Sequence, residues 1–524
     1  MLQAAADGRF APVFPGWGHY HYPISTTIDS AQYFFDQGLS LYYGYHLTES
    51  LASFKEAARR DSACAMVYWG QALAMGPYYN STYFYKMPRE VLPVLERMNA
   101  LADKAPVKEK DLISAIGLRY SGDTADSHRG QLNKDYSERM RALAGKYPDD
   151  RDIKALFIDG VMTEHAWDMW DSKGLPRPWT AELVKDCSGI LAADPYHPAA
   201  LHYQIHLLEG SLHPEEMLAS AEKLKELMPG VPHMVHMASH AYQRTGRYTS
   251  GVVINDSANA AQLRFSGLVP ELHLATNIVH YDAVEAFCAL NGAMYTKAMQ
   301  SAELCARMAV SGANIPRPYA QYLYMMPLFV QVRLGKWQAI LDRPLPDKRW
   351  TYASLLSDFA RGMAHVRTGR LDSAQVCLDD LRDKLKDSML MVRRLPNNAP
   401  VKGGSVAEGI LAGELFLARG KEQEAIAAFD RAIGLEDDMS YGEPKDWVLP
   451  ARQFAGACLL QLKRASAAEH LYREDLVQNP GNGWALLGLA QSLESRDKQG
   501  AATFRDRAGV AFASAEEMPP ASAY

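Results

Sequence analysis

The amino-acid sequence predicts an all-α protein made of consecutive helical hairpins. Apolar residues recur at steps of three and four over most of the 524-residue chain, and this spacing places them on one face of a helix. Short turns centred on glycine separate many of these segments. No stretch of alternating apolar and polar residues indicates a strand of any length. A single hairpin cannot bury its apolar face alone, so we expect neighbouring hairpins to stack into a solenoid with a continuous core.

The first predicted hairpin lies at residues 35–62, with a turn at 44–47. The same pattern returns at 409–420 and 424–433. The apolar positions of the first hairpin are Leu39, Tyr42 and Tyr43, followed by Leu51, Phe54 and Ala57. Each half therefore has one apolar face, as expected for a pair of packed amphipathic helices.

A glycine followed by a basic or charged residue marks several of the turns. The clearest examples are Thr245–Tyr248, Leu334–Trp337, Thr368–Leu371 and Arg419–Glu422. These segments resemble the tetratricopeptide repeat (TPR), which has a glycine at its inner turn and a period of about 34 residues. Gly335 and Gly369 are 34 residues apart, but Gly369 and Gly420 are 51 apart. The resemblance covers about residues 31–515 and implies a degenerate TPR-like solenoid, an α-α superhelix.

The predicted organisation has three parts. Residues 1–30 are rich in proline, glycine and aromatics and are expected to form an irregular N-terminal arm. Residues 31–300 are expected to form an N-terminal TPR-like array, and residues 301–524 a C-terminal one. A histidine-rich concave face is assigned to the first array.

Composition and charge indicate which partners and which cellular compartment to expect. A net charge of −6 and a pI near 6.3 are not typical of proteins that bind nucleic acid or anionic membranes. No apolar run approaches the roughly 20 residues needed to cross a bilayer. The six cysteines are widely spaced, without a CxxC pair, which favours a reducing compartment. No signal peptide is visible at the start, so a cytoplasmic location is expected unless a leader was removed. The oligomeric state is not predicted.

Histidines are concentrated in one part of the chain. Ten of the sixteen fall between His165 and His280. Within each group they recur at steps of three and four, which places them on one face of a helix. The predicted metal ligands are His202, His206, His236 and His240, with His233 and His280 as alternates.

The register of the repeats brings these groups together. With Gly246 as the inner-turn glycine, the resemblance to TPRs implies that His233, His236 and His240 face the groove from one helix. His202 and His206 would face it from the equivalent helix of the preceding repeat. Adjacent helices pack at roughly 8–10 Å, so both groups can reach one ion. Imidazole clusters suit copper, iron or zinc rather than magnesium or calcium, and copper or iron is favoured here over zinc.

Several polar and aromatic residues near the histidines are candidates for a supporting role. Glu209 and Asp168 are predicted to orient ligand imidazoles, because carboxylates commonly hold the second ring nitrogen of a metal-bound histidine. The remaining candidates for the pocket wall are His165, Trp167 and Asn277. The simpler interpretation, in which the tryptophans pack in the core and Asp168 caps or bridges a loop, stays open.

The sequence supports two functional hypotheses from different classes. The strings at 202–206 and 236–248 look like those of a bacterial subgroup of TPR proteins, to which no activity is assigned. No HExxH, P-loop, EF-hand or GxGxxG motif is present. The first hypothesis is a metal-dependent enzyme, an oxidoreductase using copper or iron, acting on a small-molecule or peptide substrate in the groove. The alternative is a non-catalytic scaffold that binds a peptide or protein partner in its concave groove.

Overall fold

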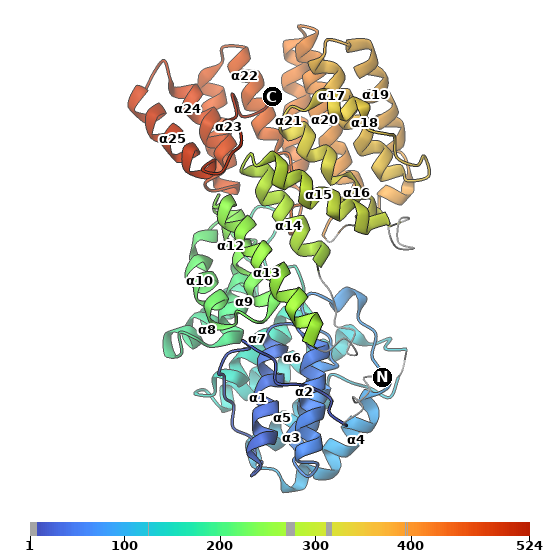
Figure 1. The fold of residues 1–524 in the computed structure, drawn as a ribbon, viewed down its shortest axis with the longest axis vertical. Coiled ribbons are helices and arrows are strands. Elements are labelled where there is room, and N and C mark those ends of the chain that lie inside the picture. Colours follow the sequence, from blue (N-terminus) through green and yellow to red (C-terminus); the bar gives the residue numbers. More distant parts are fainter. Residues whose placement is uncertain (1–7, 124, 269–277, 311–316, 393–394, 396) are drawn as a thin grey trace. The chain divides into compact units, whose positions relative to one another are not determined.

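The computed structural model describes residues 1–524 except for 1–7, 124, 269–277, 311–316, 393–394 and 396 (Figure 1). Within this described part the regular structure is helical, and the only pairing of strand type is an isolated bridge between Trp170 and Pro176. The helices follow one another as antiparallel pairs joined by short turns. The prediction of an all-α, TPR-like array of helical hairpins is therefore confirmed.

The chain divides into two compact units. The N-terminal unit comprises Met1–Asp171, Pro176–Ala238 and Ser257–Asn277, and the C-terminal unit comprises the other residues. The helices of the N-terminal unit are α1 (Asp29–Tyr43), α2 (Leu47–Arg60), α3 (Ala65–Ala74), α4 (Val91–Leu101), α5 (Val107–Gly117), α6 (Arg129–Lys146), α7 (Arg151–Glu164), α8 (Thr180–Ala193), α9 (Pro198–Leu208), α10 (Leu218–Leu227), α11 (Pro232–His236) and the end of α13 (Tyr248–Leu268).

The C-terminal unit continues the same pattern of paired helices. Its helices are α12 (Ala238–Arg244) from its second residue, the start of α13, α14 (Ile278–Asn291), α15 (Tyr295–Val310), α16 (Pro318–Arg333), α17 (Trp337–Asp342), α18 (Thr351–Arg367), α19 (Leu371–Lys384), α20 (Pro400–Ala418), α21 (Glu422–Asp437), α22 (Ala451–Gln461), α23 (Ala465–Gln478), α24 (Gly483–Leu493) and α25 (Lys498–Ala511). A continuous apolar core runs between the hairpins of this unit.

The predicted turns of both units are found where the glycine motifs place them. The first hairpin turns between α1, which ends at Tyr43, and α2, which begins at Leu47. Gly335, Gly369 and Gly420 follow α16, α18 and α20, and each has a positive φ between 65° and 73°. Glycine adopts this left-handed conformation without steric cost, so it ends one helix and lets the chain reverse into the next.

One expected helix is interrupted. The sequence places His233, His236 and His240 on a single helix, but α11 ends at His236 and α12 begins at Ala238. Met237 keeps helical backbone angles, with φ −54° and ψ −27°. The two helices are therefore separated by one residue that keeps helical backbone angles, so His233, His236 and His240 lie on two short consecutive helices rather than on one.

A buried carboxylate anchors the N-terminal arm to α7. Asp152 accepts hydrogen bonds from Tyr20 (2.5 Å) and Tyr43 (2.7 Å). Burial raises the pKa of Asp152 from 3.8 to about 6, although both tyrosine hydroxyls act in the opposite direction. His197 lies 3.7 Å from the same carboxylate, and burial lowers its pKa to about 4. Between about pH 4 and pH 6, Asp152 is therefore mostly protonated and His197 mostly deprotonated, so both side chains are neutral in this range.

We expect Asp152→Asn to change how stability depends on pH. The raised pKa means that the folded state holds this proton more tightly than the unfolded state, so the stability from neutral Asp152 is present near pH 4 and is lost as pH rises through 6. The unfolding free energy of wild type minus that of Asp152→Asn should fall by about 2–3 kcal/mol between pH 4 and 7. Urea denaturation at four pH values measures it. His197 is common to both proteins and largely cancels. A constant difference would show that Asp152 ionises in its ordinary range.

Within the part of the chain that the structure describes, every helix is too short or too polar to span a lipid bilayer.

Candidate metal centre

Three buried histidines of the N-terminal unit come together. His202 and His206 lie on α9, and His233 lies on α11. One candidate ligand atom of each ring lies within 4.8 Å of the corresponding atoms of the other two. The three residues are 0%, 1% and 6% exposed. Imidazoles in this environment are well shielded from water.

Local sequence explains why the two helices begin where they do. Pro198 and Pro232 occupy the first turns of α9 and α11, where a residue without a backbone N–H costs no helical hydrogen bond. The ring of His197 accepts a hydrogen bond from the Ala200 N–H and caps α9. His202 and His206 are then one helical turn apart, and their ring centroids are separated by 4.8 Å.

Hydrogen bonds select one ring nitrogen of each histidine on α9. The Nδ1–H of His202 donates to the backbone carbonyl of Tyr43 at 2.6 Å. Nδ1 of His206 lies 3.1 Å and 3.2 Å from the carboxylate oxygens of Glu209, which is 2% exposed. A histidine that donates from Nδ1 presents the lone pair of Nε2. The Glu209 carboxylate is therefore placed where it can fix the orientation of the His206 ring.

His233 completes the group with a neutral ring. Its backbone N–H donates to Nε2 of His46 at 3.4 Å. Among the described residues, its own buried Nε2 has no hydrogen-bond partner. Burial and then the charges of neighbouring histidines hold the pKa of His233 well below its usual range. A neutral imidazole is the form that binds a metal ion.

Tyr45 covers the three histidines and was not among the predicted residues. Its ring centroid lies 4.5 Å from that of His202, 5.8 Å from His206 and 5.7 Å from His233. It follows α1 with a φ of 56°, and the His46 N–H closes the turn onto the Leu41 carbonyl. A non-glycine residue in this conformation is uncommon, and here it directs an aromatic ring over the histidines.

Two further aromatic side chains lie beside His206. The ring centroid of Tyr79 lies 5.0 Å from that of His206, and the ring centroid of Trp167 lies 6.2 Å from it with the two planes nearly perpendicular. Tyr79 and Trp167 stack on each other at 4.9 Å. Trp167, which the sequence singles out, therefore contacts the centre. An apolar shell of this kind limits solvent access to a bound ion.

The other predicted residues have different surroundings. The His236 ring lies 6.0 Å from that of His233 in the same unit. Asp168 pairs with Arg177 at 2.8 Å on the surface, and His165 stacks on Trp179 at 3.6 Å. Among the described residues, neither Asp168 nor His165 is one of the potential ligands grouped with His202, His206 and His233. Asn277 lies outside the described residues.

His240 and His280 belong to the C-terminal unit. Nδ1 of His240 pairs with the carboxylate of Glu443, which also accepts hydrogen bonds from Tyr441 and Gln243. The ring centroids of His240 and His280 are 6.3 Å apart. Glu443 is distant in sequence from every histidine group, so no spacing pattern could have indicated it.

Comparisons with known proteins add only distant likenesses. No protein-family model and no curated sequence matches the chain. Among solved structures, it is similar to a human IFIT1 dimer with m7Gppp-AAAA, at 12% identity and a TM-score of 0.35, over 93% of this chain and 95% of that one. It is also similar to yeast Tom70, at 13% identity and a TM-score of 0.32, over 86% and 92%. The TPR domain of P58(IPK) is similar at 12% identity and a TM-score of 0.25, over 93% and 99%.

Proposed function

We propose that the N-terminal unit binds a transition metal ion through His202, His206 and His233, and that the ion carries out redox chemistry as copper or iron. The observation that supports this most directly is the meeting of three buried imidazoles from two helices. Three imidazoles and the Glu209 carboxylate near one point would be costly to bury without a shared role.

The donor set fits a metal of this class. Bonds from imidazole nitrogen to such ions are about 2.0–2.1 Å long, so ligand nitrogens sit roughly 3–4 Å apart. The upper limit of 4.8 Å between the ligand atoms is close enough for small ring rotations to complete the geometry. Three imidazoles leave at least one coordination position for a substrate or for oxygen. Nitrogen ligands of this kind favour copper, iron or zinc over calcium and magnesium.

Redox chemistry is proposed over hydrolysis because of the residues beside the imidazoles. Glu209 is engaged with His206, and the remaining walls are largely aromatic. A hydrolytic centre needs a base that can reach a metal-bound water. The chain would hold the ion, exclude bulk water with Tyr45 and Trp167, and fix the tautomer of each ligand.

Elemental analysis of the purified full-length chain tests the proposal. After expression in medium containing copper, iron and zinc, we expect close to one equivalent of copper or iron per chain. Electron paramagnetic resonance should then show nitrogen ligands and a signal that disappears on reduction. Stoichiometric zinc would contradict the redox part of the proposal, and metal-free protein would contradict all of it.

Replacing Glu209 by Gln should weaken metal binding without unfolding the protein. The variant keeps the size of the side chain but removes the charge that holds Nδ1 of His206. Loss of such an orienting partner typically lowers metal affinity 10- to 100-fold, so we expect about tenfold. Glu215→Gln is the matched control, because Glu215 pairs with the exposed His213 on the same unit. Competition with a chelator of known affinity gives both constants. Equal affinities would remove Glu209 from the centre.

A second candidate function is a non-catalytic scaffold that binds a peptide or protein partner. The stacked TPR-like hairpins support it, because repeat arrays of this type present extended binding surfaces. Metal-free protein from metal-replete medium would favour this candidate. In that case His202, His206 and His233 would be buried polar contacts of the repeat core.

A further inference from the structure

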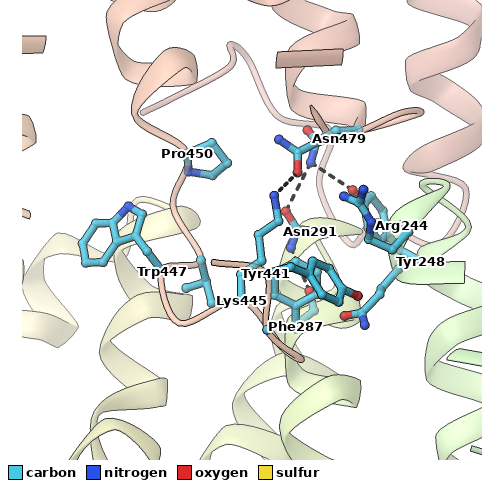
Figure 2. A pocket seen from close by; sticks show the side chains of 13 residues that line it. Arg244, Tyr248, Phe287, Asn291, Tyr441, Lys445, Trp447, Pro450 and Asn479 are labelled. Carbon is cyan, nitrogen blue, oxygen red and sulfur yellow. Dashed lines mark hydrogen bonds between the residues drawn. The ribbon is translucent and has the colours of Figure 1, made fainter. Parts of the chain in front are cut away.

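A small pocket in the C-terminal unit is lined by two cationic side chains (Figure 2). Arg244 comes from the end of α12, and Lys445 comes from the segment between α21 and α22. The side chains of Asn291, Asn479 and Asn482 also line it. The cavity volume is about 20 Å³, which is room for little more than one water-sized group. The pocket therefore suits an ion or a single small head group.

The ammonium group of Lys445 uses only part of its hydrogen-bonding capacity within the part of the chain that the structure describes. Among the described residues, its Nζ donates one hydrogen bond, to the side-chain oxygen of Asn479 at 2.6 Å, and that amide is neutral (Figure 2). Across the described residues, no carboxylate oxygen lies within 4.0 Å of this nitrogen. An ammonium carries three N–H donors. A partly buried cation in this state lacks the close counter-charge that normally accompanies it.

The guanidinium of Arg244 adds a second positive charge to the same pocket. It donates to the Gln478 carbonyl at 2.6 Å and lies 5.3 Å from the centre of the Tyr441 ring. Burial, followed by the charge of Arg244, lowers the pKa of Lys445 to about 8. Lys445 thus remains mostly protonated at neutral pH, but its charge is poorly compensated. An anion between the two cations would stabilise both.

The two carboxylates whose charges act on Lys445 are held by other donors. Asp475 accepts from Gln453 and Asn479, each at 2.8 Å. Glu436 accepts from the Ala451 N–H at 2.7 Å. Both carboxylates favour the protonated form of Lys445 from a distance, yet neither is among the residues that line the pocket. The space beside the two cations is therefore left for a mobile anion.

We propose that this pocket binds a small monovalent anion, a halide or a carboxylate group, between the Lys445 ammonium and the Arg244 guanidinium. The cations supply charge-assisted hydrogen bonds, and the asparagine amides can supply neutral donors. The cavity volume excludes larger anions such as nucleotides. This site is separate in sequence and in unit from the proposed metal centre, so either can fail without affecting the other.

The line width of the ³⁵Cl nuclear magnetic resonance signal tests the proposal on the full chain. Chloride exchanging with a protein site gives a broadened line, and formate added at constant ionic strength should reverse the broadening if carboxylates use the same site. We expect Lys445→Gln to raise the dissociation constant of chloride about tenfold or more, since it removes a charged donor. Lys445→Arg keeps the charge and should retain most of the binding.

Lys421→Gln provides the matched control, because Lys421 is an exposed lysine of the same unit. It should leave the line width unchanged. Circular dichroism establishes that each variant is folded. Chloride binding that formate does not displace identifies an inorganic ion as the occupant, whereas displacement identifies the carboxylate group; both agree with the proposal. Equal broadening in wild type and Lys445→Gln, or no excess broadening in wild type, would overturn it.

Discussion

His206→Ala is expected to reduce metal occupancy from close to one equivalent to a small fraction. The ring centroid of His206 lies 4.8 Å from that of His202 and 6.3 Å from that of His233, and the Glu209 carboxylate lies beside its Nδ1. Removing one of three imidazoles leaves two ligands, too few to hold an ion against competing chelators. Elemental analysis after dialysis against a weak chelator measures the loss.

The helix content of His206→Ala should stay close to that of wild type. The hairpins are held by their apolar cores rather than by the ion, unlike a zinc finger, which unfolds without its metal. His213→Ala is the control, because His213 is in the same unit with its side chain 70% exposed. It should keep full occupancy. Equal metal content in both variants would exclude His206 as a ligand.

Gly246→Ala should destabilise the protein by several kilocalories per mole. Gly246 has a φ of 73°, and a Cβ there would lie 2.1 Å from the Gly481 carbonyl oxygen. Both residues belong to the C-terminal unit. The left-handed conformation costs an alanine about 1 kcal/mol, and the backbone clash adds an estimated 2 kcal/mol or more. Urea denaturation followed by circular dichroism gives the change.

Gly369→Ala separates the two costs. Gly369 has the same φ of 73°, but nothing lies within 4 Å of the position of a Cβ. We expect this variant to lose only about 1 kcal/mol, from the backbone conformation alone. The difference between the two variants measures the contact between the turns at Gly246 and Gly481. Equal losses would mean that the backbone around Gly481 moves aside without cost.

The parts of the site that the sequence could predict are those set by local periodicity. His202 and His206 are four residues apart in a predicted helix, so their shared face follows from helical geometry alone. His233 was predicted only as an alternate ligand, on the register that the resemblance to TPRs implies, in which equivalent helices of adjacent repeats pack side by side. The arrangement of Glu209 beside His206 is equally local, three residues along the chain.

The parts that the sequence could not predict depend on contacts between distant segments. Tyr45 reaches the histidines only because it adopts a positive φ, which no apolar pattern encodes. Glu443 meets His240 across about 200 residues of chain. Asp168 was expected to orient an imidazole, but the chain turns after α7 and brings Arg177 to it instead. Periodicity predicts faces of helices, whereas these contacts depend on loops.

The hydrogen bond between His202 and the Tyr43 carbonyl joins residues that are 159 positions apart. A ribosome adding about 5–20 residues per second releases α1 some 10–40 s before α11. The first hairpins can therefore fold while the histidines of α9 and α11 are still being synthesised. The imidazoles then assemble against a turn that already exists. Under the proposed function, the metal site would be completed late in the synthesis of this protein, because its third ligand, His233, lies about 190 residues after Tyr43.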